Sequence, residues 1–283
     1  MRSVVRLPVA MLLPLALLPL AGCATPRAGG LEVAEADRWE ATNRKIYKFN
    51  KGVDRYALKP VATVYRTVIP KPGRQAVTNA YNNYGEPLTF VNDLLQGKIK
   101  KAFRSLDRFV LNTTLGIGGI MDVATNLGRP EEPEDFGQTF AQWGIKSGPY
   151  LMLPFIGPST LRDAFGTGFD FALQPADYGR NAIFHPTLGW KAGQIAVRFV
   201  NLRARLTDQG ADAMLAGSLD EYTLVKSAYL QNRLNLIWDG NPPYVPEDDG
   251  SGGVPGTPAT TSPATPPAAT PPNAVPPAVP PTR

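Results

Sequence analysis

Cysteine and histidine are the residues that most often serve as strong nucleophiles, proton carriers and metal ligands, and this sequence has one of each, Cys23 and His185. A disulfide needs a second thiol, and a zinc site needs more ligands than these two. The motifs H-E-x-x-H and G-x-S-x-G are both absent from the sequence. His185 stands directly before Pro186 and is predicted to lie at the start of a helix. These residue types argue against an enzyme and against a cofactor.

The surroundings of Cys23 indicate a different use for its thiol. Arg2 and Arg6 precede a short apolar run that ends in small residues, which is the order of a secretory signal. The sequence LAGC at residues 20–23 resembles the bacterial lipoprotein signal, in which the thiol is acylated and becomes the new N-terminus. Residues 1–22 are therefore predicted to be a signal peptide, and Cys23 a lipid anchor followed by a linker to residue 37. Ala and Thr follow Cys23 where a retention signal would have Asp, so we expect an outer-membrane address.

The charge balance and the C-terminal composition limit the possible partners. The formal net charge is +5, and removal of the two arginines in residues 1–22 leaves +3, which does not indicate a nucleic-acid partner. Residues 246–283 are rich in Pro, Ala and Thr and are predicted to form a disordered tail. The tail could reach the cell wall, although a solvated tail without a partner is the simpler interpretation. Residues 38–245 are predicted to form the folded domain.

Apolar residues recur at steps of three and four in this domain, which predicts helices. One helix is expected around Ile46, Phe49 and Val53, with Pro60 ending or bending it. Further helices are expected over residues 87–112, 186–206 and 220–238. Lys and Arg flank the apolar stripes, so each helix fits either a soluble core or a lipid interface, and periodicity leaves both open.

Two segments break the helical pattern. In residues 111–124 the fingerprint G-x-G-x-x-G fails at Met121, and no phosphate loop follows. Residues 148–163 are apolar but contain three prolines, so we expect a wall or rim packed against other helices, or a loop that dips partly into a leaflet. The acidic residues 131–135 lack the ligand spacing of a calcium loop and are predicted to form a solvated turn.

Five stretches resemble the MlaA (VacJ) family of outer-membrane phospholipid-binding lipoproteins. They run in family order over about residues 38–240: NRKIYKFN (43–50), RFVLNTTLGIGGIMDVA (108–124), FGQTF (136–140), GPYLMLPF (148–155) continuing to LRD (161–163), and AYLQ (228–231). The resemblance implies a mostly all-α fold, a ring-like assembly of amphipathic helices with a central polar channel, lying in one membrane leaflet. The proline-rich tail lies outside it.

The resemblance also implies a function. Proteins of this kind take mislocalised phospholipid from the outer leaflet and pass it to a periplasmic carrier (MlaC-like), which maintains outer-membrane lipid asymmetry, and trimeric porins are their membrane partners. Channel or lipid contacts are expected at Gly116, Gly118, Gly119, Tyr150, Leu151, Leu153, Phe155, Ile156 and Lys191. The glycines also fit a tight helix connection, and Lys191 also fits a solvated flank.

Two other functions remain open from the sequence. The chain could be a lipoprotein scaffold that organises porins, or links the membrane to the wall through its tail, without moving lipid. It could also be a lipid hydrolase whose site has no recognised motif.

Overall fold

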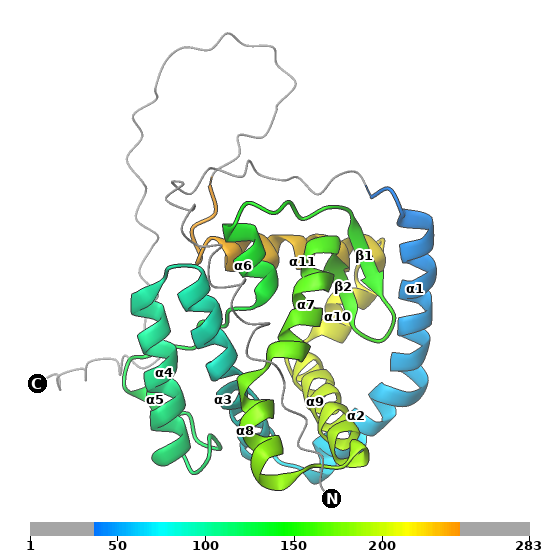
Figure 1. Ribbon diagram of the computed structural model, residues 1–283. Helices are drawn as coiled ribbons and strands as arrows, with labels where there is room; N and C mark the ends of the chain where they lie inside the picture. Colours follow the sequence, from blue (N-terminus) through cyan, green and yellow to red (C-terminus); the bar gives the residue numbers. More distant parts are fainter. Residues whose placement is uncertain (1–36, 244–283) are drawn as a thin grey trace, which may run out of the picture. The chain divides into compact units, whose positions relative to one another are not determined.

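The computed structural model describes residues 37–243, and within that range the side chains of residues 179 and 182–184 are left undescribed (Figure 1). The predicted signal peptide, Cys23 and nearly all of the linker lie outside the described residues, as does the predicted tail. The described residues comprise nearly all of the predicted folded domain.

The first half of the domain is a succession of helices. In chain order these are α1 (Glu40–Val53), a π-helical turn (Asp54–Leu58), α2 (Lys59–Val68), α3 (Lys71–Leu95), α4 (Ile99–Thr114), α5 (Val123–Asn126) and α6 (Phe136–Gln142).

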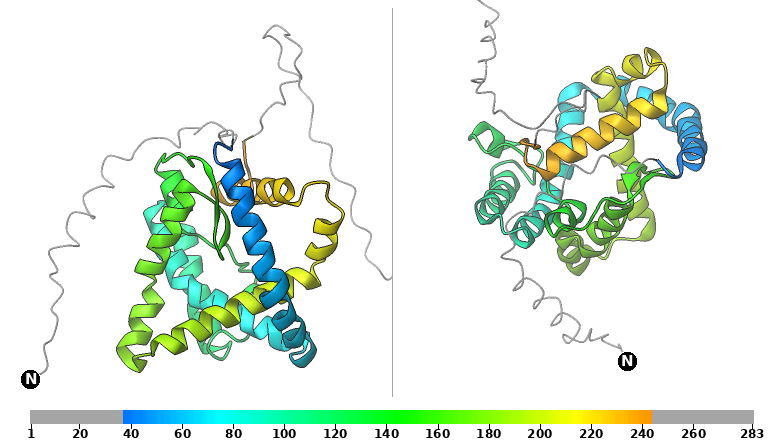
Figure 2. Two further views of the ribbon diagram at one scale, coloured as in Figure 1. Left: turned by 90° about the vertical axis from the view of Figure 1, so that its right-hand side faces the viewer. Right: turned by 90° about the horizontal axis from the view of Figure 1, so that it is seen from above.

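The second half opens with two short strands and is otherwise helical. It consists of β1 (Tyr150–Leu153), β2 (Gly157–Thr160), α7 (Leu161–Leu173), α8 (Pro175–Phe184), α9 (Leu188–Asp208), α10 (Ala211–Ala216) and α11 (Glu221–Ile237). The prediction of a mostly α-helical fold is confirmed. Seen from above, the helices follow one another in a ring-like arrangement, and α11 crosses its upper side (Figure 2).

The prediction of one helix over residues 87–112 is wrong. Pro87 lies inside α3, and α3 and α4 are separate helices that pack against each other. The break is a glycine cap: Gly97 has φ +74°, its N–H bonds the carbonyl of Leu94, and the N–H of Lys98 bonds the carbonyl of Asp93. These two bonds form a Schellman motif, which ends a helix although the apolar spacing continues.

Pro60 does not end its helix. The helical path continues to Val68, and the disturbance lies just before the proline, where the N–H of Lys59 bonds the carbonyl of Asp54 in a π-helical turn. A π turn accommodates a proline because it rearranges the local hydrogen-bond ladder. His185 also differs from its prediction, because it caps the end of α8 with φ +44°.

Residues 148–163, for which a wall or rim packed against helices or a loop in a leaflet was expected, contain a β-hairpin that packs against α1 and α11. Strands β1 and β2 pair antiparallel, with Tyr150 opposite Thr160 and Leu153 opposite Gly157. Two asparagines of α1, seven residues apart, hold the hairpin backbone. Asn43 donates to the carbonyl of Tyr150 and accepts from the N–H of Met152, and Asn50 bonds Leu153 and Phe155 in the same way, at 2.9–3.0 Å.

The largest apolar core lies where the hairpin meets α1 and α11. Tyr150, Met152 and Tyr222 are buried there, and Ile46, Tyr47 and Tyr229 pack around them. The rings of Tyr150 and Tyr222 meet edge to face with centroids 6.1 Å apart. The hairpin is therefore anchored through its side chains as well as its backbone.

Helices α6 and α7 cross at two glycines. A Cβ added at Gly166 would lie 2.4 Å from the backbone nitrogen of Gly137, and one at Gly137 would lie 2.3 Å from a guanidinium nitrogen of Arg233. Both distances are far below van der Waals contact, so neither position has room for a side chain.

We therefore expect Gly166→Ala to lower the free energy of unfolding by about 1–3 kcal/mol, because the added methyl must push α6 away from α7. Gly168→Ala is the matched control, since Gly168 lies on the same helix and has open space around it. The control should leave stability unchanged or raise it, as alanine favours helix. Thermal unfolding of both variants checks this, and equal melting temperatures would contradict the crossing.

Candidate lipid-contact surface and polar interior

Helix α4 has inverted amphipathicity, which means that its apolar side is exposed and its polar side is buried. Its exposed stripe is apolar, with Phe103 63% exposed, and the residues buried on the opposite side are small or polar. Arg108, on the buried side, is only 2% exposed. The exposed stripe comprises Ile99, Phe103, Leu106 and Val110, and the buried side comprises Ala102, Ser105, Arg108 and Asn112.

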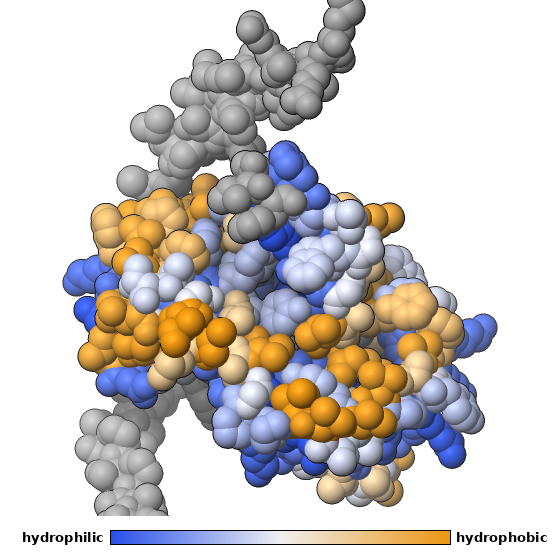
Figure 3. Space-filling view, turned by 90° about the horizontal axis from the view of Figure 1, so that it is seen from below, coloured by the Kyte–Doolittle hydropathy of each residue, from blue (hydrophilic) through white to orange (hydrophobic). Residues whose placement is uncertain are grey.

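Other helices also expose apolar residues. Helix α2 exposes three valines, and α9 exposes Leu188, Trp190 and Ile195 while it buries Asn201 and Arg203. In the part of the chain that the structure describes, twenty polar or charged residues are buried against nine apolar ones. Viewed from below, hydrophobic patches spread over much of the surface (Figure 3). Exposed apolar area on this scale needs a lipid or protein cover.

Many of the buried polar residues are paired across helices. Arg108 of α4 donates to Glu86 of α3 at 2.6 Å and to the hydroxyl of Thr125 at 3.0 Å. Its guanidinium also bonds the carbonyl of Arg129. One arginine therefore ties α3 and α4 to α5 and the segment after it, as a buried charge requires.

The acidic segment 131–135 is not simply a solvated turn, which corrects the prediction. Glu134 is buried and accepts from Gln96 at 2.9 Å and Lys98 at 3.0 Å. Asp135 caps α6 and accepts two bonds of 2.6 Å from Arg233 of α11. Burial raises the pKa of Asp135, but the hydrogen bonds and charge of Arg233 outweigh it, so the pKa lies below its ordinary value.

A second carboxylate beside this pair has the opposite behaviour. Asp170 of α7 accepts the N–H of Phe136 at 3.0 Å, and burial raises its pKa from 3.8 to about 7. The negative charge of Asp135 adds to this effect. The contact with the first N–H of α6 gives Asp170 a structural task, because a helix N-terminus needs acceptors.

The three predicted glycines form a tight connection between α4 and α5. Gly116 is buried, and a Cβ there would lie 2.2 Å from the carbonyl oxygen of Met121. Gly119 has φ +90° and lies against Asn83. Gly118, with φ +69°, faces open space. The close approach at Gly116 and Gly119 is thus to the protein itself.

The hairpin candidates divide into buried and exposed residues. Tyr150 is fully buried in the core, so its side chain offers no surface to a lipid, contrary to the expectation. Leu151 and Leu153 are half-buried, and only Phe155 and Ile156 at the turn are well exposed. Lys191 lies half-buried in the first turn of α9.

Sequence reasoning missed the inward-facing polar residues, although a signal for them was present. In α4, residues 105, 108 and 112 follow helical spacing and are Ser, Arg and Asn. A second periodic stripe of hydroxyl, amide and guanidinium groups, opposite the apolar stripe of an amphipathic helix, is a signal for a buried polar side.

None of the helices in residues 37–243 is long and apolar enough to cross a membrane. A mostly helical domain with large apolar groups outside and polar groups inside is of the class whose outer face is covered by lipid or by a partner protein.

Comparison with known proteins agrees with this class. The family model for the MlaA lipoprotein matches residues 35–236. The "Intermembrane phospholipid transport system lipoprotein MlaA" of Escherichia coli is 36% identical over 231 residues, which cover 78% of this chain and 85% of the relative. The Haemophilus influenzae protein of the same name is 32% identical over 234 residues, 80% of this chain and 89% of the relative.

A solved structure supports the same conclusion. It comes from work on the structural basis for maintenance of bacterial outer membrane lipid asymmetry, shares 36% sequence identity and has a TM-score of 0.62. The match covers 73% of this chain and 100% of the solved one. The chain belongs to the MlaA lipoprotein family.

The raised pKa of Asp170 makes a prediction about stability. Between pH 4 and 7 the folded state keeps a proton that the unfolded state releases, so the free energy of unfolding should fall as pH rises through this window. Asp170→Asn cannot ionise and should remove the part of this decline that Asp170 contributes, whereas Glu86 and Asp93, whose pKa values burial also raises, keep their parts. At pH 8 the variant should be more stable than the wild type by on the order of 2 kcal/mol, allowing for solvent screening.

Denaturant unfolding at several pH values measures this difference. Glu40→Gln, a change at an exposed carboxylate of α1, is the control and should follow the wild-type profile. A wild-type stability that rises between pH 4 and 7, with no difference from Asp170→Asn, would contradict the assignment.

Proposed function

We propose that this chain is an outer-membrane lipoprotein that removes mislocalised phospholipid from the outer leaflet and passes it to a periplasmic carrier, which maintains lipid asymmetry. The observation that carries the proposal is the inverted amphipathicity of α4, with an exposed apolar stripe and a buried polar side, together with the exposed apolar residues of α2 and α9. The names of the relatives, which describe phospholipid transport, support it.

The physical reason lies in the two ends of a phospholipid. Moving a charged headgroup through hydrocarbon removes its hydration at a cost of several kcal/mol. A ring of helices with a polar central channel would keep the headgroup solvated while the acyl chains stay outside in lipid. No covalent step is needed, so we propose transport rather than catalysis.

The position in the membrane follows from the same surface. Each large apolar side chain covered by acyl chains contributes about 1.5–3 kcal/mol, so the exposed stripes would hold the domain in the periplasmic leaflet. In the proposal, acylated Cys23 adds the anchor. Phe155 and Ile156 at the hairpin turn would contact lipid, and Lys191 would face the channel.

The protein partners proposed are a trimeric porin of the outer membrane and a soluble periplasmic phospholipid carrier. The exposed aromatic residues Trp143, Phe165 and Phe169 near α6 and α7 offer contact area that either lipid or a porin could cover. Contact with these partners does not by itself move lipid, so the proposal also requires that phospholipid passes from the membrane to the carrier.

Purified full-length protein should carry phospholipid out of outer membranes, as measured by mass spectrometry, and should accelerate transfer of a fluorescent phospholipid from vesicles to the carrier. Phe103→Asp should weaken vesicle association roughly tenfold, because it places a charge in the apolar stripe. Lys100→Asp, a change to an exposed neighbour on α4, is the matched control.

Three results would contradict the proposal. Porin binding with no change in lipid exchange would indicate a scaffold. Release of lyso-lipid or fatty acid, lost in His185→Ala, would indicate a hydrolase. If Phe103→Asp associates with vesicles as strongly as the wild type, the α4 stripe does not contact the membrane.

A further inference from the structure

A polar pocket of about 410 Å³ lies where α2, the start of α3 and the end of α9 meet. A second pocket of about 210 Å³ shares Lys71, Arg74 and Asp208 with it and extends between α3 and α9. Most of the remaining lining residues carry hydroxyl, amide or guanidinium groups, so the two pockets form one polar depression.

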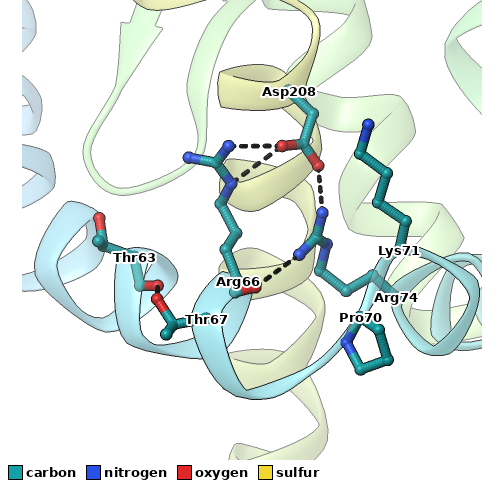
Figure 4. A pocket seen from close by; sticks show the side chains of 7 residues that line it. All are labelled: Thr63, Arg66, Thr67, Pro70, Lys71, Arg74 and Asp208. Carbon is teal, nitrogen blue, oxygen red and sulfur yellow. Dashed lines mark hydrogen bonds and ion pairs between the residues drawn. The ribbon is translucent and has the colours of Figure 1, made fainter.

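Two arginines at the pocket are fixed in place by a single carboxylate. Arg66 binds one oxygen of Asp208 at 2.6 Å, and Arg74 binds the other at 2.6 Å (Figure 4). Arg74 also donates to the carbonyls of Arg66 and Ile69 at 3.0 and 2.9 Å, which completes the end of α2. Burial raises the pKa of Asp208, but hydrogen bonds from Arg66 and the charges of both arginines keep it below its usual value.

The pocket has more positive than negative charge. Lys71 and Arg205 also line it, and neither forms an ion pair within residues 37–243. Four cationic side chains thus face one carboxylate, an excess of three charges. Glu131, whose carboxyl feels the charge of Arg205, lines neither pocket. An excess of this size around fixed guanidinium groups favours a small multivalent anion.

We propose that this depression binds the phosphate of a glycerophospholipid, an assignment that rests on the proposed function. Lys71 and Arg205 supply the charges that the protein leaves unpaired, and the Arg66–Asp208–Arg74 cluster holds the pocket open. Threonine, asparagine and glutamine side chains of the lining offer further polar contacts to the glycerol or headgroup.

The neighbouring surface favours a lipid over free phosphate. Helix α2 presents Thr63, Arg66 and Thr67 to the pocket, and on its opposite side it exposes Val61, Val64 and Val68. A helix is only about 10 Å wide. A lipid whose phosphate lies in the pocket can therefore lay its acyl chains around the valine side, whereas free phosphate would use the pocket alone.

Two binding measurements on the detergent-solubilised full-length protein test this. The first titrates inorganic phosphate by calorimetry, and the second counts the phosphatidylglycerol retained after exchange with mixed micelles. Lys71→Ala and Arg205→Ala should each weaken both about fivefold, the loss expected for one charged contact of about 1 kcal/mol. Lys48→Ala, at an exposed lysine of α1, is the matched control and should change neither.

A photoreactive phosphatidylglycerol adds a readout that does not depend on variants. A reactive group on the headgroup should label Thr63 or Lys71, and one at the end of an acyl chain should label the valine side of α2. Headgroup labelling confined to other helices would overturn the assignment.

The outcomes separate the site from the function. Weaker phosphate binding with unchanged lipid retention would make this a site for free phosphate and would overturn the lipid assignment. Unchanged values in both measurements would overturn the site while transport stands. A wild-type protein that retains no phospholipid would overturn the proposed function and this assignment with it.

Discussion

The structure depends on one constraint: polar side chains that face inward must find their partners inside the protein. An unpaired buried charge costs several kcal/mol, and removing one member of a buried ion pair costs about 3–5 kcal/mol. The helices meet this constraint with single residues that each serve several partners. Arg108 joins α3, α4 and the segment around α5, and Arg233 bridges Asp135 and Asp163 between α6 and α7. Because the interior is paired in this way, the outer faces of the helices are available to apolar residues.

Glycines and asparagines set how closely the elements approach. Gly137 and Gly166 let α6 and α7 cross beside the guanidinium of Arg233, so helix packing and ion pairing share one location. Asn43 and Asn50 of α1 bond the backbone of β1 and the hairpin turn that follows it. The hairpin then carries Phe155 and Ile156 at its exposed turn. The residues that support the outer surface are thus mostly buried and polar.

The sequence predicted well where several helices lie along the chain. It predicted poorly which side of each helix is buried. The stretches 186–206 and 220–238 agree closely with α9 and α11, because Thr187 and Asp220 begin those helices with side-chain caps. The stretch 87–112 failed because apolar spacing runs on through Gly97. Tyr150 was expected to contact lipid or the channel because it lies in an apolar segment with three prolines. In the structure, β1 pairs with β2, and the side chain of Tyr150 is buried in the core.

The candidate site residues were also predicted only in part. Several motif residues that carry the family resemblance, such as Asn43, Gly137 and Asp163, proved to be buried contacts. The polar depression brings together residues 63–74 and 201–208, which are over a hundred positions apart in the sequence. No local sequence pattern predicts that they meet. The inverted amphipathicity of α4 is the observation on which the proposed function depends most, and it can be measured directly on membrane-bound protein.

Spin labels can be attached to vesicle-bound protein through four single substitutions, Ile99→Cys, Phe103→Cys, Leu106→Cys and Val110→Cys. The accessibility of each label is then measured with two relaxation agents, oxygen, which concentrates in lipid, and a water-soluble nickel chelate. We predict high oxygen and low nickel accessibility at all four positions, and the reverse at Lys100→Cys. Labels at the four apolar positions that respond mainly to nickel would show that water, rather than lipid, covers this face, and the inverted stripe of α4 would then have no role in holding the protein in the membrane.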